Sequence, residues 1–288
     1  MRKLKKANIQ PKAFLHDIIQ TKTKTNKKRL NNMKSKLEMR YDEYCIKANS
    51  NKLHLLSEIW HYDKTKTKSD GFFLYRQYDN SKTSILNLRT KIIEANDGEI
   101  VLKCPICELR DATELDHYIP RMLFPEFSIH SFNLIPTCHE CNHIKSEKWC
   151  KDNKRLFFNA YYDTPTKEFL FNISVKKENK LLRINLTLKT YKEPKDDTRI
   201  ALTTFEELNL MPYVNQKINE MFGRELNRII IRKKRSKEEI NVFLKKEKEI
   251  IEDTIADIAD VNNWDRIVLQ TIIDTPAVEE WIKEQCGT

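Results

Sequence analysis

The stretches CPIC (104–107) and CHEC (138–141) bracket the part of the chain that decides its fold, and 30 residues separate them. A two-residue gap lets both sulfurs of a pair turn toward one ion, and two such pairs complete a tetrahedral site. Thiolates are soft ligands that select Zn²⁺ over hard cations. The spacing therefore predicts a structural zinc site formed by Cys104, Cys107, Cys138 and Cys141.

The residues between the cysteine pairs predict short regular elements. In ELDHYIP (114–120), polar and apolar residues alternate, which is typical of a strand, and Pro120 interrupts the ladder. FNLIPTC (132–138) predicts a second short strand, and the second cysteine pair leads into a helix. The expected order is strand, loop, strand and helix.

The motifs C-x-x-C, L-D-H-x-x-P and N-L-I-P-x-C-x-x-C-N-x-x-K follow one another within residues 100–150. This order resembles the zinc-clamped HNH endonuclease family, which has a ββα-metal fold. By position, the resemblance implies that His117 is the general base and that Asp116 binds the catalytic divalent ion. It also implies that Asn133 holds the loop and orients the His117 ring, and that Asn142 is the second ion ligand.

The chemistry of these residue types agrees with the resemblance. A histidine with an ordinary pKa near 6.5 accepts a proton at neutral pH when a neighbour fixes its tautomer. A carboxylate and an amide oxygen are hard ligands suited to Mg²⁺ or Mn²⁺. His139 and His143 are four residues apart, so they share a helix face, and His143 remains the alternative to Asn142 as an ion ligand.

Three cationic residues of the same region are candidate contacts for nucleic-acid phosphates: Arg121, Lys145 and Lys148. His130 lies in the loop between the predicted strands, and we expect it at the protein surface.

The charge of the chain favours an anionic partner such as DNA. The 288 residues carry a formal charge of +10. Residues 1–40 contain 13 Lys and Arg against Asp17 and Glu38, so this arm alone carries +11. It includes the run TKTKTNKK (21–28), which is echoed by KTKTK (64–68). We expect these runs to be mobile or to contact nucleic acid.

The rest of the composition excludes other classes. No apolar stretch follows the basic start, and none approaches the roughly 20 residues needed to span a bilayer. Cysteine pairs of this kind favour a reducing cytoplasm. The four glycines form no phosphate-binding loop, so nucleotide hydrolysis is not expected.

The predicted fold class is α+β, with the HNH core flanked by other elements. Residues 1–99 form a basic arm and helical region that includes a helix over 84–96, ended by Asp97-Gly98. A β-hairpin extension over 151–195 follows the core at 100–150. Residues 196–288 are predicted to be helical, with capping boxes at Thr203-x-x-Glu206 and Ser236-x-x-Glu239.

Three functions fit these features. The first is a metal-dependent DNA endonuclease with one divalent ion, and FFNAYYD (157–163) resembles a segment of bacterial HNH proteins. In this chain Asn159-Ala160 replaces the usual His-Pro. Some such proteins act in phage defence beside an ATPase partner, as in Septu-type systems. The alternatives are a non-catalytic zinc-dependent nucleic-acid-binding protein and an HNH-like RNase toxin.

Overall fold

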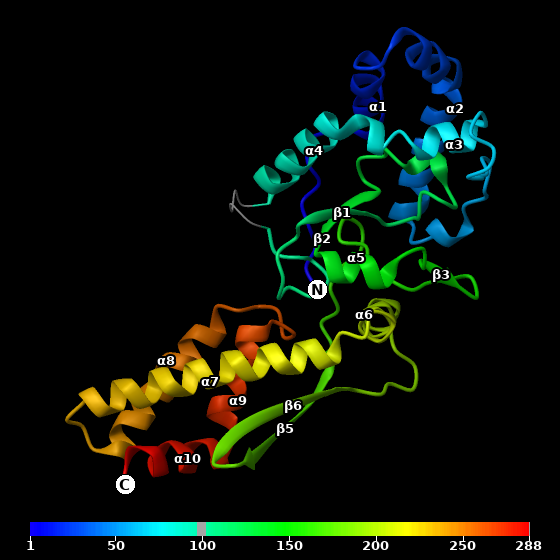
Figure 1. Cartoon of the computed structure of the whole chain (residues 1–288). Coiled ribbons are helices and arrows are strands. Elements are labelled where there is room, and N and C mark those ends of the chain that lie inside the picture. Colours follow the sequence, from blue (N-terminus) through cyan, green and yellow to red (C-terminus); the bar gives the residue numbers. More distant parts are fainter. Residues whose placement is uncertain (97–101, 288) are drawn as a thin grey trace. The chain divides into compact units, whose positions relative to one another are not determined.

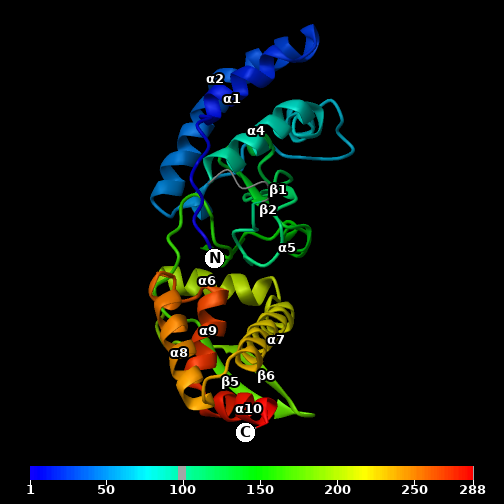
Figure 2. The ribbon, with the colours of Figure 1, turned by 90° about the vertical axis from the view of Figure 1, so that its left-hand side faces the viewer.

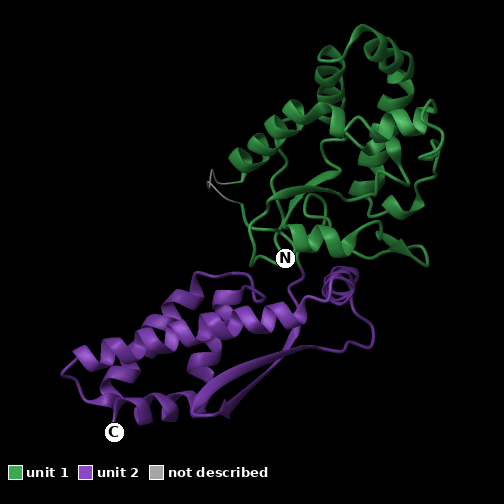
Figure 3. Ribbon diagram, viewed as in Figure 1, with its two compact units in different colours: residues 1–165 green, residues 166–288 purple. Residues whose placement is uncertain are grey.

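The computed structural model describes residues 1–96 and 102–287 and combines helices with short antiparallel strands (Figure 1). The predicted α+β class is confirmed at this level. The chain divides into two compact units, residues 1–165 and 166–288 (Figure 3).

The unit boundary falls after Pro165. Unit 1 therefore contains the predicted regions 1–99 and 100–150, and unit 2 contains the hairpin and all the helices that follow it. The predicted helix end at Asp97-Gly98 lies outside the described residues.

The N-terminal arm of unit 1 is folded, so its basic run is not mobile, and contact with nucleic acid stays a prediction. Helices α1 and α2 lie side by side (Figure 2). The positions Leu30, Leu37, Tyr41 and Tyr44 of α2 are buried at helical spacing. This apolar face stabilises the helix despite its charge, because packing outweighs the repulsion of exposed lysines. The helices of this part are α1 (Pro11–Gln20), α2 (Lys24–Asn49), α3 (Asp70–Tyr75) and α4 (Lys82–Ala95).

The helix predicted over 84–96 is confirmed as α4, which buries Ile85, Leu88 and Ile92. It is preceded by two short 3-10 helices, η1 (Leu53–Leu55) and η2 (Asp79–Ser81).

The predicted order of strand, loop, strand and helix is also observed. Strand β1 (Glu114–His117) pairs antiparallel with β2 (Leu134–Thr137), and α5 (His139–Lys145) follows with Cys138 as its N-cap. The connection carries the 3-10 helix η3 (Pro125–Phe127). Beyond α5, the chain forms the small ladder β3 (Cys150–Lys151) and β4 (Lys154–Arg155).

Unit 2 begins with the predicted hairpin, β5 (Phe171–Glu178) paired with β6 (Leu181–Leu188). Helix α7 (Met211–Arg235) lies against β6. The side-chain amide of Asn215 bonds the backbone N–H and oxygen of Leu186, and the amide of Asn219 bonds those of Ile184. The backbone groups of these two β6 residues are thereby satisfied as they would be by another strand.

The remaining helices of unit 2 pack around an apolar core. The face of α7 predicted as core is buried at Val214, Ile218, Phe222, Leu226, Ile229 and Ile230. The helices are α6 (Asp196–Glu207), α8 (Ile240–Ala256), α9 (Trp264–Asp274) and α10 (Pro276–Cys286).

Both predicted capping boxes are wrong. Thr203 lies inside α6, which begins seven residues earlier at Asp196. Helix α8 begins at Ile240, and the Glu239 carboxylate itself accepts from the first backbone N–H groups. Ser236 instead ends α7. None of the helices within the described ranges is long and apolar enough to cross a membrane.

Candidate functional site

The four cysteines of the two C-x-x-C pairs come together in unit 1. All four are buried, and their Sγ atoms lie within 4.8 Å of one another. A tetrahedral zinc ion with Zn–S bonds of about 2.3 Å needs sulfurs about 3.8 Å apart, which this cluster accommodates. The backbone N–H of Cys141 also bonds the Sγ of Cys138, which fixes that pair at the start of α5. The cluster can therefore hold a metal such as zinc.

His117 ends β1 and is held by the connection between the strands. Its Nε2 lies 2.9 Å from the backbone oxygen of Ser128, and its ring packs edge-on against Tyr78. Because a carbonyl oxygen only accepts, Nε2 carries the proton and Nδ1 is the basic nitrogen. Burial, with a contribution from Arg121, lowers the pKa of His117 to about 3, so the ring is neutral at pH 7.

Asp116 is buried and paired with a lysine. Nζ of Lys145 lies 3.0 Å from one carboxylate oxygen of Asp116 and 3.1 Å from the other, and it donates to the backbone oxygen of His117. Burial raises the pKa of Asp116, and Lys145 opposes this rise. Of the two lysines predicted as phosphate contacts, Lys148 is exposed. Lys145 is buried and is the counterion of Asp116.

Glu114 adds a second carboxylate that the sequence analysis did not single out. Its two oxygens lie 2.6 Å from Nδ2 of Asn142 and 2.7 Å from Nδ1 of His139. Although burial opposes the shift, these hydrogen bonds lower the pKa of Glu114. The ring of His143 stacks on His139, with 5.7 Å between centroids. The signal in the sequence was the strand alternation, which places Glu114 and Asp116 on the same face.

Asn133 braces the loop, although not through His117. Its side chain is fully buried and bonds both backbone groups of Ile119 and the backbone oxygen of Phe127. The predicted bond from its amide to the His117 ring is absent among the described residues. Ser128 orients the ring instead, and the hydroxyl of Ser128 is anchored on Leu74 of α3.

Helix α2 supports the same loop through a buried ion pair. Arg40 donates through Nε and a terminal nitrogen to Glu126, at 3.0 and 2.8 Å. These side chains are 4% and 0% exposed, respectively. Tyr44 of α2 donates to the side-chain oxygen of Asn133. Ser128, which bonds the His117 ring, thus follows two residues after Glu126, the buried partner of Arg40.

His130 is buried, so the prediction of a surface position is wrong. Its ring lies among those of Tyr41, Tyr44 and Phe127. Burial lowers its pKa to about 3, so the imidazole is neutral. The residues near His130 in the sequence do not indicate its burial, because two of its ring partners, Tyr41 and Tyr44, are on α2, more than 80 residues away.

A cavity of about 560 Å³ collects the candidate residues. Four predicted residues line it: Asp116, His117, Arg121 and Asn142. Residues that the sequence analysis had not singled out contribute a carboxylate, a second arginine and two aromatic rings: Glu114, Arg89, Tyr75 and Tyr78. Arg121 is held over the Tyr75 ring at 4.3 Å and bonds Asp79.

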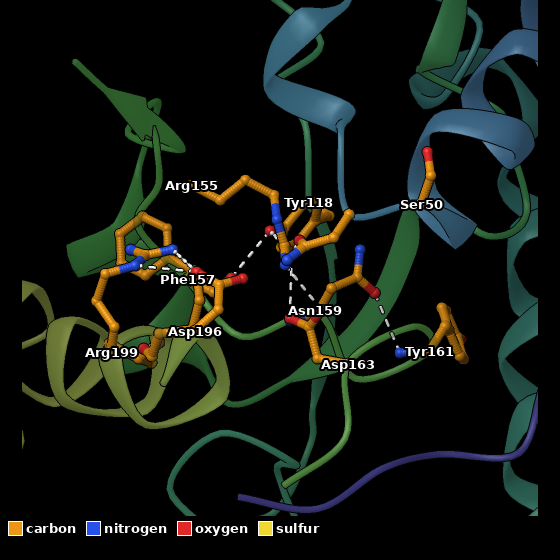
Figure 4. Close-up of polar contacts among 12 residues, drawn as sticks. Ser50, Tyr118, Arg155, Phe157, Asn159, Tyr161, Asp163, Asp196 and Arg199 are labelled. Atoms are coloured by element: carbon orange, nitrogen blue, oxygen red, sulfur yellow. Dashed lines mark hydrogen bonds and ion pairs between the residues drawn. The ribbon is translucent and has the colours of Figure 1, made fainter. Parts of the chain in front are cut away.

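A buried polar network supports the end of β1 (Figure 4). Arg155 donates to the Tyr118 hydroxyl and forms an ion pair with Asp163. The Asp163 carboxylate also accepts from the backbone N–H of Asn159. The FFNAYYD segment therefore anchors the residue that follows His117.

Comparisons with known proteins give one distant relative. The chain is 24% identical over 228 residues to Protein ea31 of Escherichia phage lambda, a match that covers 73% of each protein. No protein-family model matches the chain. No solved structure matches it.

Proposed function

We propose that the cavity binds a DNA phosphodiester and that the protein is a metal-dependent endonuclease of the HNH type. The observation that carries this proposal is the arrangement at the end of β1. A neutral imidazole with its Nε2 fixed by Ser128 shares one cavity with oxygen ligands and with Arg121. A base, an ion-binding group and a phosphate-binding cation are the parts that phosphodiester hydrolysis requires.

The four-cysteine cluster is the proposed structural zinc site. Its sulfur spacing fits a tetrahedral ion, and four protein ligands leave no position for a reacting water. Zinc here would join the turn at Cys104 to the start of α5, and so hold the strands between them in register.

Oxygen ligands on the cavity wall fit a hard divalent ion. Asp116, Glu114 and Asn142 offer carboxylate and amide oxygens, the ligands that Mg²⁺ and Mn²⁺ prefer. Each carboxylate oxygen has two lone pairs, so the contact of Asp116 with Lys145 leaves positions for an ion. When bound, the ion would neutralise charge that develops on the phosphate and on the leaving oxygen.

His117 would take the proton from the attacking water at Nδ1. In the free protein its low pKa, caused first by burial and then by Arg121, makes it a weak base. An anionic phosphate bound beside Arg121 would offset the second of these causes.

The observation that favours the alternative is the Lys145–Asp116 ion pair. A lysine that neutralises the carboxylate could replace the metal, as expected in a zinc-dependent binding protein without activity. An RNase would differ from the proposed DNA endonuclease only in its substrate, so cleavage of DNA and of RNA must be compared directly.

The proposed biological role is phage defence together with an ATPase partner. Its support is the resemblance of the FFNAYYD segment, in which Asp163 anchors the site as a paired carboxylate. Added partner protein should then increase the cleavage rate.

The test is nicking of supercoiled plasmid with Mg²⁺ or Mn²⁺, beside an RNA of similar length. We expect His117→Ala to lower the rate by roughly 10²–10⁴-fold, the usual contribution of a general base. The matched control is His16→Ala, an exposed histidine of α1, which should cut like the wild type.

Equal cutting by wild type and His117→Ala would remove His117 as the base. Cutting of RNA alone would establish the RNase alternative. Binding of DNA without cleavage, with the partner present, would establish the binding protein.

A further inference from the structure

Two basic runs that are distant in the sequence meet in unit 1. The run at 21–28 leads into α2, and the run at 64–68 precedes α3. Arg29 of α2 donates to the backbone oxygen of Lys68 at 2.8 Å and bonds the Asp70 carboxylate. Two turns further along α2, Lys36 lies over the Trp60 ring at 4.5 Å. The N-terminal half of α2 is thus joined to segment 60–70.

Three cations of this surface are in ion pairs: Arg29 with Asp70, Lys34 with Glu38 and Lys66 with Asp63. The others have no acidic partner within the described residues. Lys24, Lys28, Lys64 and Lys68 are exposed, and no described carboxylate lies within ion-pair distance of them. Lys22 bonds a backbone oxygen and a hydroxyl rather than an acid. Charges of one sign gathered on one surface attract an anionic partner.

The surface adjoins the cavity through stacked rings. Tyr62, two residues before Lys64, stacks on Tyr75 with 4.1 Å between centroids, and Tyr75 lines the cavity. Segment 60–70 is also packed closely on α3. A Cβ at Gly71 would lie 1.9 Å from the backbone oxygen of His61. The start of segment 60–70 is therefore fixed against an element that lines the cavity.

We propose that α2 from Lys24 to Lys36 and segment 60–70 form a docking surface for the DNA backbone. It would bind phosphates that flank the scissile one. This inference rests on the proposed function only in placing the scissile phosphate at His117. Scattered, flexible ammonium groups suit sequence-independent phosphate contacts, which position a duplex without reading its bases.

The test measures duplex DNA binding as a function of salt, in the His117→Ala background so that cleavage during the measurement is slow. The variant replaces Lys24, Lys28, Lys64 and Lys68 by Gln. Each lost phosphate contact lowers the slope of log K against log salt by about 0.9. We expect a slope reduced by roughly 2–4 and a Kd raised at least about 10-fold near 150 mM salt.

The matched control removes the same charge from unit 2 by replacing four exposed lysines with Gln: Lys167, Lys176, Lys192 and Lys237. If the proposed surface binds DNA, the Kd and the salt slope of this control should change little. Equal losses in both variants would show a net-charge effect and overturn the proposal. The proposal would also be overturned if the lysine variant lost binding to vesicles of anionic phospholipid to the same extent as it lost binding to DNA.

Gly71→Ala provides a test at constant charge. The added Cβ must displace the backbone at His61, which moves the lysines of segment 60–70 relative to α3. We expect weaker DNA binding with unchanged net charge and unchanged zinc content. If Gly71→Ala and the lysine variant both bound DNA as tightly as the parent protein, the proposed docking surface would be contradicted.

The two proposals fail differently. If the wild type cuts no nucleic acid and the lysine variant still loses binding, the docking surface stands without the nuclease. If the wild type cuts DNA and the lysine variant binds and cuts equally well, the nuclease stands without the surface.

Discussion

The two units differ in how many reactive side chains they contain. All seven histidines of the chain and six of its seven cysteines lie in unit 1, and only Cys286 lies in unit 2. Unit 1 buries charged pairs such as Arg40 with Glu126 and Asp116 with Lys145. Unit 2 is built on an apolar stripe of α7 and on the ring cluster of Phe171, Phe205 and Trp264.

This difference has a physical consequence for stability. Metal ligands and buried ionisable groups make the folding free energy depend on metal and on pH. Apolar burial depends on neither. Among its described residues, unit 2 has one buried carboxylate, Glu247, which pairs with Arg232. Unit 1 should therefore respond to chelators, and it should respond to acid more strongly than unit 2.

Loss of Cys104, a proposed zinc ligand, should give the largest difference in stability between the two units. A structural zinc site contributes about 10–16 kcal/mol of binding free energy in small domains, most of it as folding free energy. We expect Cys104→Ser to lose zinc and unfold unit 1, while hydrogen exchange in α7 of unit 2 stays slow.

Cys286→Ser is the control, because this thiol is in unit 2 and outside the cluster. It should keep one zinc per chain and the stability of the wild type. A folded, zinc-free Cys104→Ser protein would show that the cluster does not hold unit 1 together.

Breaking the buried ion pair should have the next largest effect. Arg40→Met leaves Glu126 charged and buried, which costs about 3–5 kcal/mol in such pairs. Because Glu126 lies in the loop that fixes His117, catalysis should fall as well. Chemical denaturation, with the plasmid assay on the folded fraction, measures both.

The matched change in unit 2 is Arg228→Met, at an exposed pair with side chains 64% and 28% exposed. Its effect should stay below about 1 kcal/mol. Similar losses at Arg40 and Arg228 would remove the distinction between the units.

The contribution of buried histidines to the acid response should be smaller, and it arises in unit 1. The pKa of His130 is lowered to about 3 in the folded protein, so below its ordinary value near 6.5 the unfolded chain binds the extra proton. Stability is therefore complete above pH 6.5 and lost as the pH falls toward 3. The loss that His130 contributes between pH 7 and 5 should be about 2 kcal/mol.

His130→Phe should keep the ring packing with Tyr41 and Tyr44 and remove this part of the acid response. Zinc loss at low pH acts equally on wild type and variant, so their difference in unfolding free energy isolates His130. The same pH dependence in both proteins would refute the assignment.

Local patterns predicted the elements around the site. The cysteine spacing, the alternation in ELDHYIP and the apolar stripe of α7 were sufficient, because each reflects contacts within one element or between paired ligands. The capping boxes failed because a hydroxyl residue three positions before a glutamate is common and specifies a helix start only together with the backbone conformation.

The support behind the site could not be predicted. Glu126 and His130 lie in a loop, and their partners Arg40 and Tyr44 are more than 80 residues away on a helix that looked like a basic arm. The burial of Lys145 depends likewise on Asp116 in another element. Pairings of this kind follow from tertiary packing and leave no periodic signal.

The role of His117 as the base is tested most directly by chemical rescue of His117→Gly with imidazole in the plasmid assay. We expect the variant to cut far more slowly than the wild type and to regain activity as imidazole is added, whereas the activity of His16→Ala should not depend on imidazole. A His117→Gly protein that cuts as fast as the wild type without imidazole would contradict this role.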